Sequence, residues 1–289
     1  MIIGFTGNYR KKEYFSILSK VHKTLSKSKN KLLISNDLLR NEEFSVPANY
    51  SLIDFESLNK KVDIILAVGG DGTILSTVRR LGQKQKPIMG IHIGGLGFLS
   101  ECVEKNLEKN INYLLENKLS ISKRMLLNIT IDLNGKKQNF LAMNDVVVDH
   151  GPSGRILKTE VHVSKNYLNT YEGDGLIVAT PTGSTAYSLS AGGPIVYPNI
   201  NTITVTPICS HSLSARPIVL RGSENIELKF PDSSENFSLS VDGQVRFEIN
   251  KDTNVIIAKT KYNAKLINLL NSSYFDTLRT KMGWSGNIR

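Results

Sequence analysis

The stretch Val68-Gly69-Gly70-Asp71-Gly72-Thr73 constrains the fold of this 289-residue chain most strongly, since it joins an apolar run at 62–68 to a helix-like run at 74–81. Three glycines within four positions remove the Cβ atoms that would keep a phosphate group away from the backbone. A helix that follows such a loop directs its free N–H groups and positive dipole end at the anion. The loop lacks the Gly-Lys-Ser/Thr of a Walker A sequence, so a nucleotide would bind here without that lysine. The pattern predicts a strand, a phosphate-binding loop and a helix.

Asp71 is an unexpected residue in an anion-binding loop, because its carboxylate repels phosphate. A negative charge has a use there if it accepts a proton from an attacking hydroxyl. The alternative is purely local, a Gly-Asp-Gly-Thr turn in which Thr73 caps the following helix. The two further glycines and the strand-loop-helix setting favour phosphate chemistry.

The composition is that of a soluble globular protein, with 40% hydrophobic and 21% charged residues. The length suits two domains, each with its own core. Apolar runs are too short for a transmembrane helix, and the N-terminus shows no secretory signal. Cys102 and Cys209 lie far apart and are expected to be reduced thiols. We therefore expect a cytoplasmic protein with no membrane partner.

The net charge of +10 is partly concentrated between Arg10 and Lys31, where eight Lys and Arg residues face one acid, Glu13. Nucleic-acid binding is one interpretation, but no aromatic platform or known reader motif accompanies the charge. A solvated basic helix face is the favoured one, so no nucleic-acid partner is expected. The charge would also help attract anionic nucleotides.

Strands and helices alternate over the first hundred residues. Strands are expected at 2–6, 31–35, 62–68 and 87–93, and helices at 13–26 and 74–81. Such alternation predicts a parallel sheet with helices on its faces, and ligands bind beyond the carboxyl ends of its strands. A second glycine cluster at 90–99 would place another loop beside the first, or form only a tight turn at a strand end.

The character of the chain changes after a helix expected at 103–117. Short strands are predicted at 126–133, 138–142, 145–149, 160–164, 176–179, 202–207, 225–230, 237–241 and 255–259. Asn134-Gly135 and Asp242-Gly243 are hairpin turn signals, so this part predicts a β-sandwich-like domain. The tail at 266–278 is expected to be helical. We expect an α/β domain at 1–100, a β-rich domain at 101–262, and a helical tail at 263–289 that packs on the first domain.

A second dense patch spans residues 172–194, where a strand runs into Thr180-Pro181-Thr182-Gly183-Ser184. Small and hydroxylated side chains suit an adenine and a ribose, although a glycine-rich connection with capping hydroxyls is the alternative. The five histidines show no metal-ligand spacing with either cysteine, so no metal site is expected. A Gly-x-Ser-x-Gly elbow is absent, and so is a Gly-x-Gly-x-x-Gly after the first strand, which argues against an ordinary dinucleotide oxidoreductase.

Taken together, these motifs resemble the NAD kinase family in order and spacing, over nearly the whole chain. The first motif is shared with lipid kinases and phosphofructokinases, whereas the run from Thr180 to Ser188 is far more specific. The resemblance rests on Gly69-Gly70-Asp71-Gly72-Thr73, Gly94-Gly95-Leu96-Gly97-Phe98-Leu99, Asn144-Asp145, the segment 174–194, Asp242-Gly243-Gln244 and the tail 273–284.

The resemblance implies transfer of the γ-phosphoryl of ATP, with Mg²⁺ or another divalent cation, to the 2′-hydroxyl of the adenosine ribose of NAD. Asp71 would be the proton acceptor, Asn144 would suit the base and Asp145 the ribose hydroxyls. The residues implied to contact ATP phosphate are Gly69, Gly70, Gly72 and Thr73. Those implied to contact NAD are Asp71, Gly72, Asn144, Asp145, Arg155, Asp174, Thr185, Ala186, Tyr187, Ser188, Leu189, Ser190 and Gln244.

The fold implied is a Rossmann-like parallel α/β domain followed by a β-sandwich-like domain, in a homo-oligomer (dimer or tetramer) built through the β-rich part. Two positions depart from the family pattern: Asp145 stands where Glu is more frequent, and Glu172 where many relatives carry Arg. Two other functions remain open, a lipid kinase that shares the glycine–aspartate loop and a non-catalytic NAD- or NADP-binding regulator.

Overall fold

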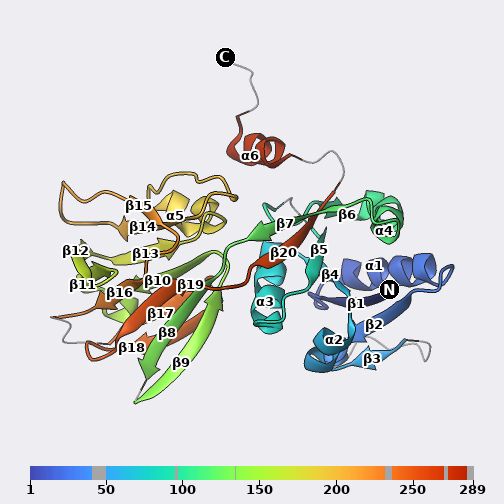
Figure 1. The fold of residues 1–289 in the computed structure, drawn as a ribbon, viewed down its shortest axis with the longest axis horizontal. Helices are drawn as coiled ribbons and strands as arrows, with labels where there is room; N and C mark the ends of the chain where they lie inside the picture. Colours follow the sequence, from blue (N-terminus) through green and yellow to red (C-terminus); the bar gives the residue numbers. More distant parts are fainter. Residues whose placement is uncertain (41–49, 95–96, 134, 232–235, 270–272, 285–289) are drawn as a thin grey trace. The chain divides into compact units, whose positions relative to one another are not determined.

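The computed structural model describes residues 1–40, 50–94, 97–133, 135–231, 236–269 and 273–284. The chain forms two units (Figure 1): unit 1 is Met1–Lys123 with Lys265–Arg289, and unit 2 is Arg124–Ala264. The domain limits expected at 100 and 262 from the sequence stay a prediction.

Unit 1 is built on an eight-stranded sheet in the order β3-β2-β1-β4-β5-β20-β7, with β6 paired to β5. The pairs from β3 to β20 are parallel, and so is that of β6 with β5, which confirms the predicted α/β arrangement. The strands are β1 (Ile2–Gly7), β2 (Lys31–Ser35), β3 (Leu52–Ile53), β4 (Ile64–Gly69), β5 (Pro87–His92), β6 (Cys102–Val103), β7 (Ser120–Arg124) and β20 (Ala264–Asn268).

Helices cover both faces of this sheet. On one face, Ile3 and Phe5 of β1 share a core with α1 and α4, and α1 buries residues at the three- and four-residue spacing of an amphipathic helix. On the other face, a Cβ on Gly4 would lie 2.8 Å from Cδ2 of Leu58, so α2 packs closely on β1 there. The helices are α1 (Lys12–Leu25), α2 (Phe55–Lys61), α3 (Asp71–Leu81), α4 (Leu107–Leu115) and α6 (Tyr274–Met282), with 3₁₀ turns η1 (Asn36–Arg40) and η2 (Glu104–Asn106).

Unit 2 is a sandwich of two six-stranded antiparallel sheets. The first has the order β15-β14-β13-β10-β17-β18 and the second β12-β11-β16-β19-β8-β9. One buried cluster takes Val146 and Val148 from β10 and Ile129 and Ile131 from β8, so the two sheets share a core. The predicted sandwich is confirmed.

The strands that the structure describes in unit 2 number twelve. They are β8 (Leu127–Leu133), β9 (Lys136–Ala142), β10 (Asp145–Asp149), β11 (Leu157–Val163), β12 (Asn166–Gly173), β13 (Gly175–Ala179), β14 (Thr202–Ile208), β15 (Ile218–Arg221), β16 (Ile226–Lys229), β17 (Phe237–Val241), β18 (Val245–Ile249) and β19 (Val255–Lys259). The short helical pieces are η3 (Gly151–Ser153), η4 (Gly183–Thr185) and α5 (Tyr187–Ser190).

The tail differs from its prediction, because residues 264–268 form strand β20 and the helix begins only at Tyr274. Lys265 and Leu266 pair in parallel with Pro87 and Ile88, so tertiary pairing overrides the helical pattern of the local sequence. The Asp242-Gly243 hairpin turn is confirmed, with φ of 52° and 62°, and it joins β17 to β18. The other expected turn includes Asn134, which lies outside the described residues.

Candidate functional site

The predicted phosphate loop is a single residue between β4 and α3. Gly69 has φ of +153°, and a Cβ there would lie 2.1 Å from Oγ1 of Thr73. Gly70 has an extended backbone, and a Cβ on it would meet no atom within 4 Å. Gly69 is therefore required by its close approach to Thr73, whereas Gly70 leaves the main chain open to an approaching group.

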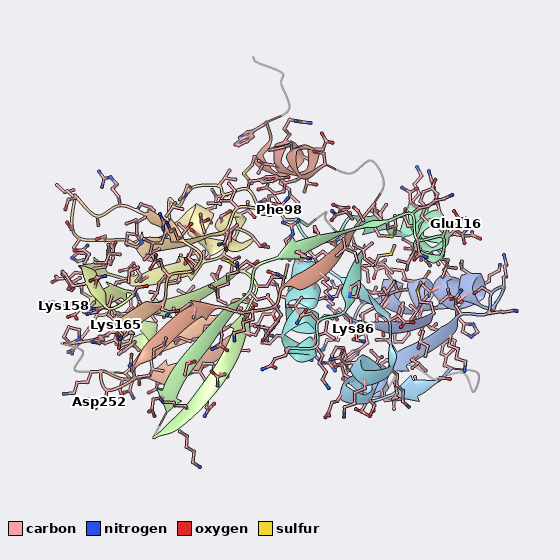
Figure 2. All side chains as sticks on the ribbon, viewed as in Figure 1. Lys86, Phe98, Glu116, Lys158, Lys165 and Asp252 are labelled. Carbon is pink, nitrogen blue, oxygen red and sulfur yellow. The ribbon has the colours of Figure 1, made fainter. Side chains whose placement is uncertain are left out.

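Asp71 occupies the first residue of α3 and is half-buried. Its Oδ2 accepts the backbone N–H of Phe98 at 2.7 Å, and its Oδ1 accepts that of Leu99 at 3.1 Å. A Cβ on Gly97 would lie 1.9 Å from Oδ1 of Asp71. The end of the second glycine cluster therefore holds this carboxylate in one orientation. Figure 2 labels Phe98 in unit 1.

Three connecting segments of unit 2 meet at the same end of one sheet. Asp145 begins β10 and pairs with Ala179, the last residue of β13, while Val146 pairs with Val241, the last residue of β17. This register brings Asn144, the loop that starts at Thr180 and the Asp242 turn to one edge.

The segment 143–145 is held through its backbone. Oδ1 of Asp242 accepts the N–H groups of Met143 at 3.1 Å, Asn144 at 2.8 Å and Asp145 at 3.2 Å. From another direction, Thr180 donates its N–H to the carbonyl of Asn144 at 2.8 Å and its hydroxyl to that of Met143 at 2.6 Å. Neither Asp242 nor Thr180 was among the predicted site residues. Asp242 was assigned a hairpin turn and a place in the Asp242-Gly243-Gln244 motif, but no contact of its own, and its buried position follows from long-range pairing.

Asp145 is almost fully buried, with 4% of its surface exposed. Burial, and to a smaller extent the charge of Asp242, together raise the pKa of its carboxyl to about 7. A carboxyl with such a pKa is partly protonated at neutral pH, so it can donate a hydrogen bond as well as accept one.

The hydroxyl-rich loop packs on the outer face of this sheet. Val147, Ile177, Ala179 and Ile208 form a small buried cluster there, against which Ala191 packs at the end of α5. Since alternate residues of a strand share a face, Asp145 and Asp149 lie on the same face of β10 as Val147.

Two residues of α5 interact with that face, Ser188 through a hydroxyl contact and Tyr187 through nearby acidic groups. Oγ of Ser188 is 3.0 Å from Oγ1 of Thr206 on β14. Tyr187 is 47% exposed, and its pKa is raised by burial and then by the charges of Asp149, Cys209, Asp174 and Asp145. The remaining predicted contacts of this loop are Thr185 in η4, Ala186 before α5, and Leu189 and Ser190 within α5.

The other predicted residues of unit 2 are more dispersed. Asp174 lies between β12 and β13, near the end of β10 remote from Asp145, and its hydrogen bond with Cys209 raises the pKa of that thiol. Arg155 and Gln244 are exposed on loops. Glu172 forms an exposed ion pair with Lys158 at 3.2 Å. The residues predicted to bind ATP phosphate and Asp71 belong to unit 1, and the rest belong to unit 2.

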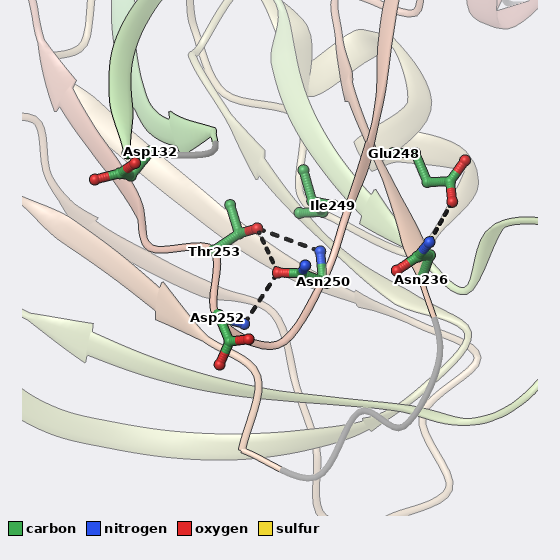
Figure 3. A pocket seen from close by; sticks show the side chains of 8 residues that line it. Asp132, Asn236, Glu248, Ile249, Asn250, Asp252 and Thr253 are labelled. Atoms are coloured by element: carbon green, nitrogen blue, oxygen red, sulfur yellow. Dashed lines mark hydrogen bonds between the residues drawn. The ribbon is translucent and has the colours of Figure 1, made fainter.

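Other sites are not evident among the described residues. No group of three or more acidic, histidine or cysteine side chains is arranged to hold a metal ion within that part of the chain. No helix in the described part has the length and apolar character needed to cross a membrane. A cavity of about 470 Å³ in unit 2 is lined by Asp132, Asn250 and Asp252 among others, and none of the predicted site residues lines it (Figure 3).

Comparisons with family models and with known relatives all point to the same family. Residues 3–119 match the ATP-NAD kinase N-terminal domain, and residues 143–269 match the ATP-NAD kinase C-terminal domain. An NAD kinase of Clostridium botulinum (strain 657 / Type Ba4) is 39% identical over 268 residues, covering 93% of this chain and 90% of the relative. An NAD kinase of Geobacter sulfurreducens is 39% identical over 230 residues, covering 79% and 81%.

Two solved structures share the fold. Yeast NADH kinase complexed with NADH superposes with a TM-score of 0.88 at 24% identity, covering 100% of this chain and 89% of that one. An NAD kinase from Archaeoglobus fulgidus in complex with ATP has a TM-score of 0.76 at 23% identity, covering 99% and 100%.

Proposed function

Because this chain belongs to the NAD kinase family, we propose that it transfers the γ-phosphoryl of ATP to the 2′-hydroxyl of the adenosine ribose of NAD, giving NADP. The observation that carries the proposal is the geometry around Asp71. A fixed carboxylate stands at the N-terminus of α3, beside a loop in which Gly70 leaves the backbone open. A phosphate and a hydroxyl that must lose its proton both have a place there.

Phosphoryl transfer depends mainly on positioning and on stabilisation of charge. The first N–H groups of α3 stabilise phosphate charge, and Asp71 accepts the proton of the 2′-hydroxyl. Each carboxylate oxygen has two lone pairs. The N–H groups of Phe98 and Leu99 therefore leave Asp71 able to accept a further hydrogen bond from the substrate.

In the proposed complex, the adenosine of NAD lies against Asn144 and Asp145. The amide of Asn144 suits an adenine edge, and the carboxyl of Asp145 suits ribose hydroxyls. The remaining contacts proposed are Arg155, Asp174, Thr185, Ala186, Tyr187, Ser188, Leu189, Ser190 and Gln244. Support comes from the packing of α5 on the face of β10 that carries Asp145.

A divalent cation is proposed to enter with ATP. The phosphate oxygens are hard donors of the kind Mg²⁺ prefers, and Mg²⁺ in such sites commonly uses substrate phosphates with few protein ligands. When bound, the cation would neutralise charge on the transferring group. We also propose a cytoplasmic location, which the two free thiols, Cys102 and Cys209, support, and a homo-oligomer, which light scattering would measure.

The test is a magnesium-dependent assay of NADP formation by the purified protein. Its arms compare ATP with polyphosphate and NAD with NADH, and a lipid substrate is added as a separate arm. NADP formed from ATP and NAD supports the proposal. Lipid phosphorylation without NADP would replace it with a lipid kinase, and NAD binding without turnover would replace it with a regulator.

A further inference from the structure

Asp242 is a buried acid outside the set of residues that the proposed function places against substrates. It is 8% exposed and has φ of +52°, a backbone conformation that costs free energy for any residue with a Cβ. Its carboxylate accepts three consecutive backbone N–H groups, and its own N–H donates to the carbonyl of Asp145 at 2.9 Å. These four hydrogen bonds tie the turn after β17 to the start of β10.

The opposite side of the same segment is held by Thr180. Its N–H and hydroxyl occupy the carbonyls of Asn144 and Met143. Gly183 packs directly against the same segment, because a Cβ on it would lie 2.1 Å from the carbonyl oxygen of Asn144. With these backbone groups engaged, the segment can offer a ligand mainly the side chains of Asn144 and Asp145.

The surroundings stabilise the ionised form of Asp242 more than that of Asp145. Asp242 has backbone dipoles directed at it, which stabilises its ionised form. Asp145 is buried beside that charge and near Tyr187, whose pKa is raised first by burial and then by nearby acidic groups that include Asp149 and Asp145. Of the two carboxyls, Asp145 therefore binds a proton the more tightly, and it is the group proposed to meet the ribose.

We propose that Asp242 is a positioning residue for the dinucleotide: it fixes the backbone of 143–145 and places its own charge beside the carboxyl of Asp145. The inference rests on the proposed function in one respect, that Asn144 and Asp145 contact the adenosine. It predicts that a defect at Asp242 weakens NAD binding selectively and leaves the use of ATP intact.

The first test compares Asp242→Asn with Asp242→Ala and a matched control, Asp252→Asn. The asparagine keeps the shape and one acceptor oxygen but loses the charge. Asp252 is an exposed acid of the same unit, in the turn at Asn250–Thr253 (Figure 3). We expect Asp242→Asn to raise the KM for NAD about tenfold, the cost of weakening charged hydrogen bonds. The KM for ATP should stay within about threefold, and the control should match wild type.

A second measurement separates positioning from a purely structural role. The KM for NAD of the wild-type enzyme should change as Asp145 titrates, and Asp242→Asn should move that inflection to lower pH because a neighbouring negative charge is removed. An unchanged inflection overturns the inference, and so does an equal loss of NAD and ATP affinity or an unchanged KM for NAD.

Two further arms keep the test decisive. If Asp242→Asn does not fold, Thr180→Val loosens the same segment, because it removes the hydroxyl's bonds to Met143 and Gly183 at nearly constant volume. An unchanged KM for NAD in that variant overturns the inference. Calorimetric titration of NAD into wild type and variants reads the binding effect even where no NADP forms. Failure of the proposed function is therefore distinguishable from failure of the inference.

Discussion

Two acids proposed to face substrate, Asp71 and Asp145, sit in opposite environments. Asp71 is half-buried and accepts two backbone N–H groups. Asp145 is buried beside another carboxylate, and its pKa is raised to about 7. Two carboxyls whose surroundings differ in this way suit different tasks: Asp71 suits proton acceptance, and Asp145 suits hydrogen bonding to neutral hydroxyls.

Replacement of Asp71 by asparagine should abolish most turnover while NAD still binds. General-base help is worth about 10²–10⁴-fold in rate, so a drop of that order in kcat is expected. The amide cannot take the proton, but it keeps the shape of the side chain and an oxygen for Phe98 or Leu99. Rates of NADP formation and calorimetric NAD binding measure the two effects. Near-normal turnover in the purified variant would remove Asp71 from the base role.

Compared with wild type, the Asp145→Asn variant should be relatively more stable at pH 8 than at pH 5. The pKa of Asp145 rises from an ordinary value of 3.8 to about 7 on folding, so the folded state binds this proton more tightly than the unfolded state. Stability from this group is present below pH 4 and is lost as the pH rises through about 7. Asparagine resembles the protonated acid, so the variant escapes that loss.

The difference in unfolding free energy between Asp145→Asn and wild type should be about 2 kcal/mol more favourable to the variant at pH 8 than at pH 5. Urea unfolding at both pH values measures it. Asp252→Asn, which changes an exposed acid in the same way, should show no such pH-dependent difference. Equal effects of Asp145→Asn at the two pH values would contradict the assigned pKa.

At the scale of the elements, the phosphate loop was predictable from its residues because strand, glycines and helix adjoin in the sequence. The strands Lys31–Ser35, Asp145–Asp149, Phe237–Val241 and Val255–Lys259 also have their predicted bounds. Edge strands β12, β15 and β18 were missed: β12 is mostly polar, β15 has only four residues, and the alternation of apolar and charged residues in β18 was overlooked.

The arrangement around Asp145 was only partly predictable. Its motif was found, but the three N–H bonds to Asp242 join residues 97 to 99 positions apart in the chain. Likewise, the hold of Phe98 and Leu99 on Asp71 depends on how β5 lies beside β4. Local spacing identifies residue types in a site, and the pairing of distant strands decides which of them touch.

The adjacent glycines of the loop should respond differently to alanine. A Cβ on Gly69 would overlap Thr73, and its φ of +153° disfavours a side chain, so Gly69→Ala should lower the unfolding free energy by about 2 kcal/mol or more. Gly70→Ala meets open space and should change it by less than about 0.5 kcal/mol.

Gly70→Ala should nevertheless raise the KM for ATP, because its methyl group would occupy the proposed phosphate position. Urea unfolding and steady-state kinetics of the two variants separate these effects. A Gly70→Ala enzyme with normal use of ATP would place the phosphate elsewhere.

At the scale of the whole molecule, the two classes of unit, parallel α/β and β-sandwich, followed from the changing pattern along the chain. The tail was expected to pack on the first domain as a helix, and the strand with which it begins was not expected. Residues 264–268 carry a helical-looking pattern, but they complete the parallel sheet between β5 and β7.

Unit 2 should fold as an isolated fragment of residues 124–264. It has its own buried cluster, drawn from both sheets, and its ends are the places where the chain leaves and re-enters unit 1. We expect cooperative thermal unfolding by circular dichroism, without NADP formation, because Asp71 and the phosphate loop lie in unit 1. A fragment that lacks a cooperative transition would show that the sandwich depends on unit 1.

The place of β20 has a consequence for biosynthesis. In the sheet of unit 1, β20 lies between β5 and β7, although about 175 residues separate it from β5 along the chain. A ribosome delivers the N-terminal part first, and domains tend to fold as units as they emerge. The nascent chain must therefore hold the seven earlier strands, β1 to β7, with a gap between β5 and β7 until the whole sandwich has been made. For that interval the start of β5, at Pro87 and Ile88, lacks the partner that β20 later supplies, which makes it a segment that a chaperone could shield.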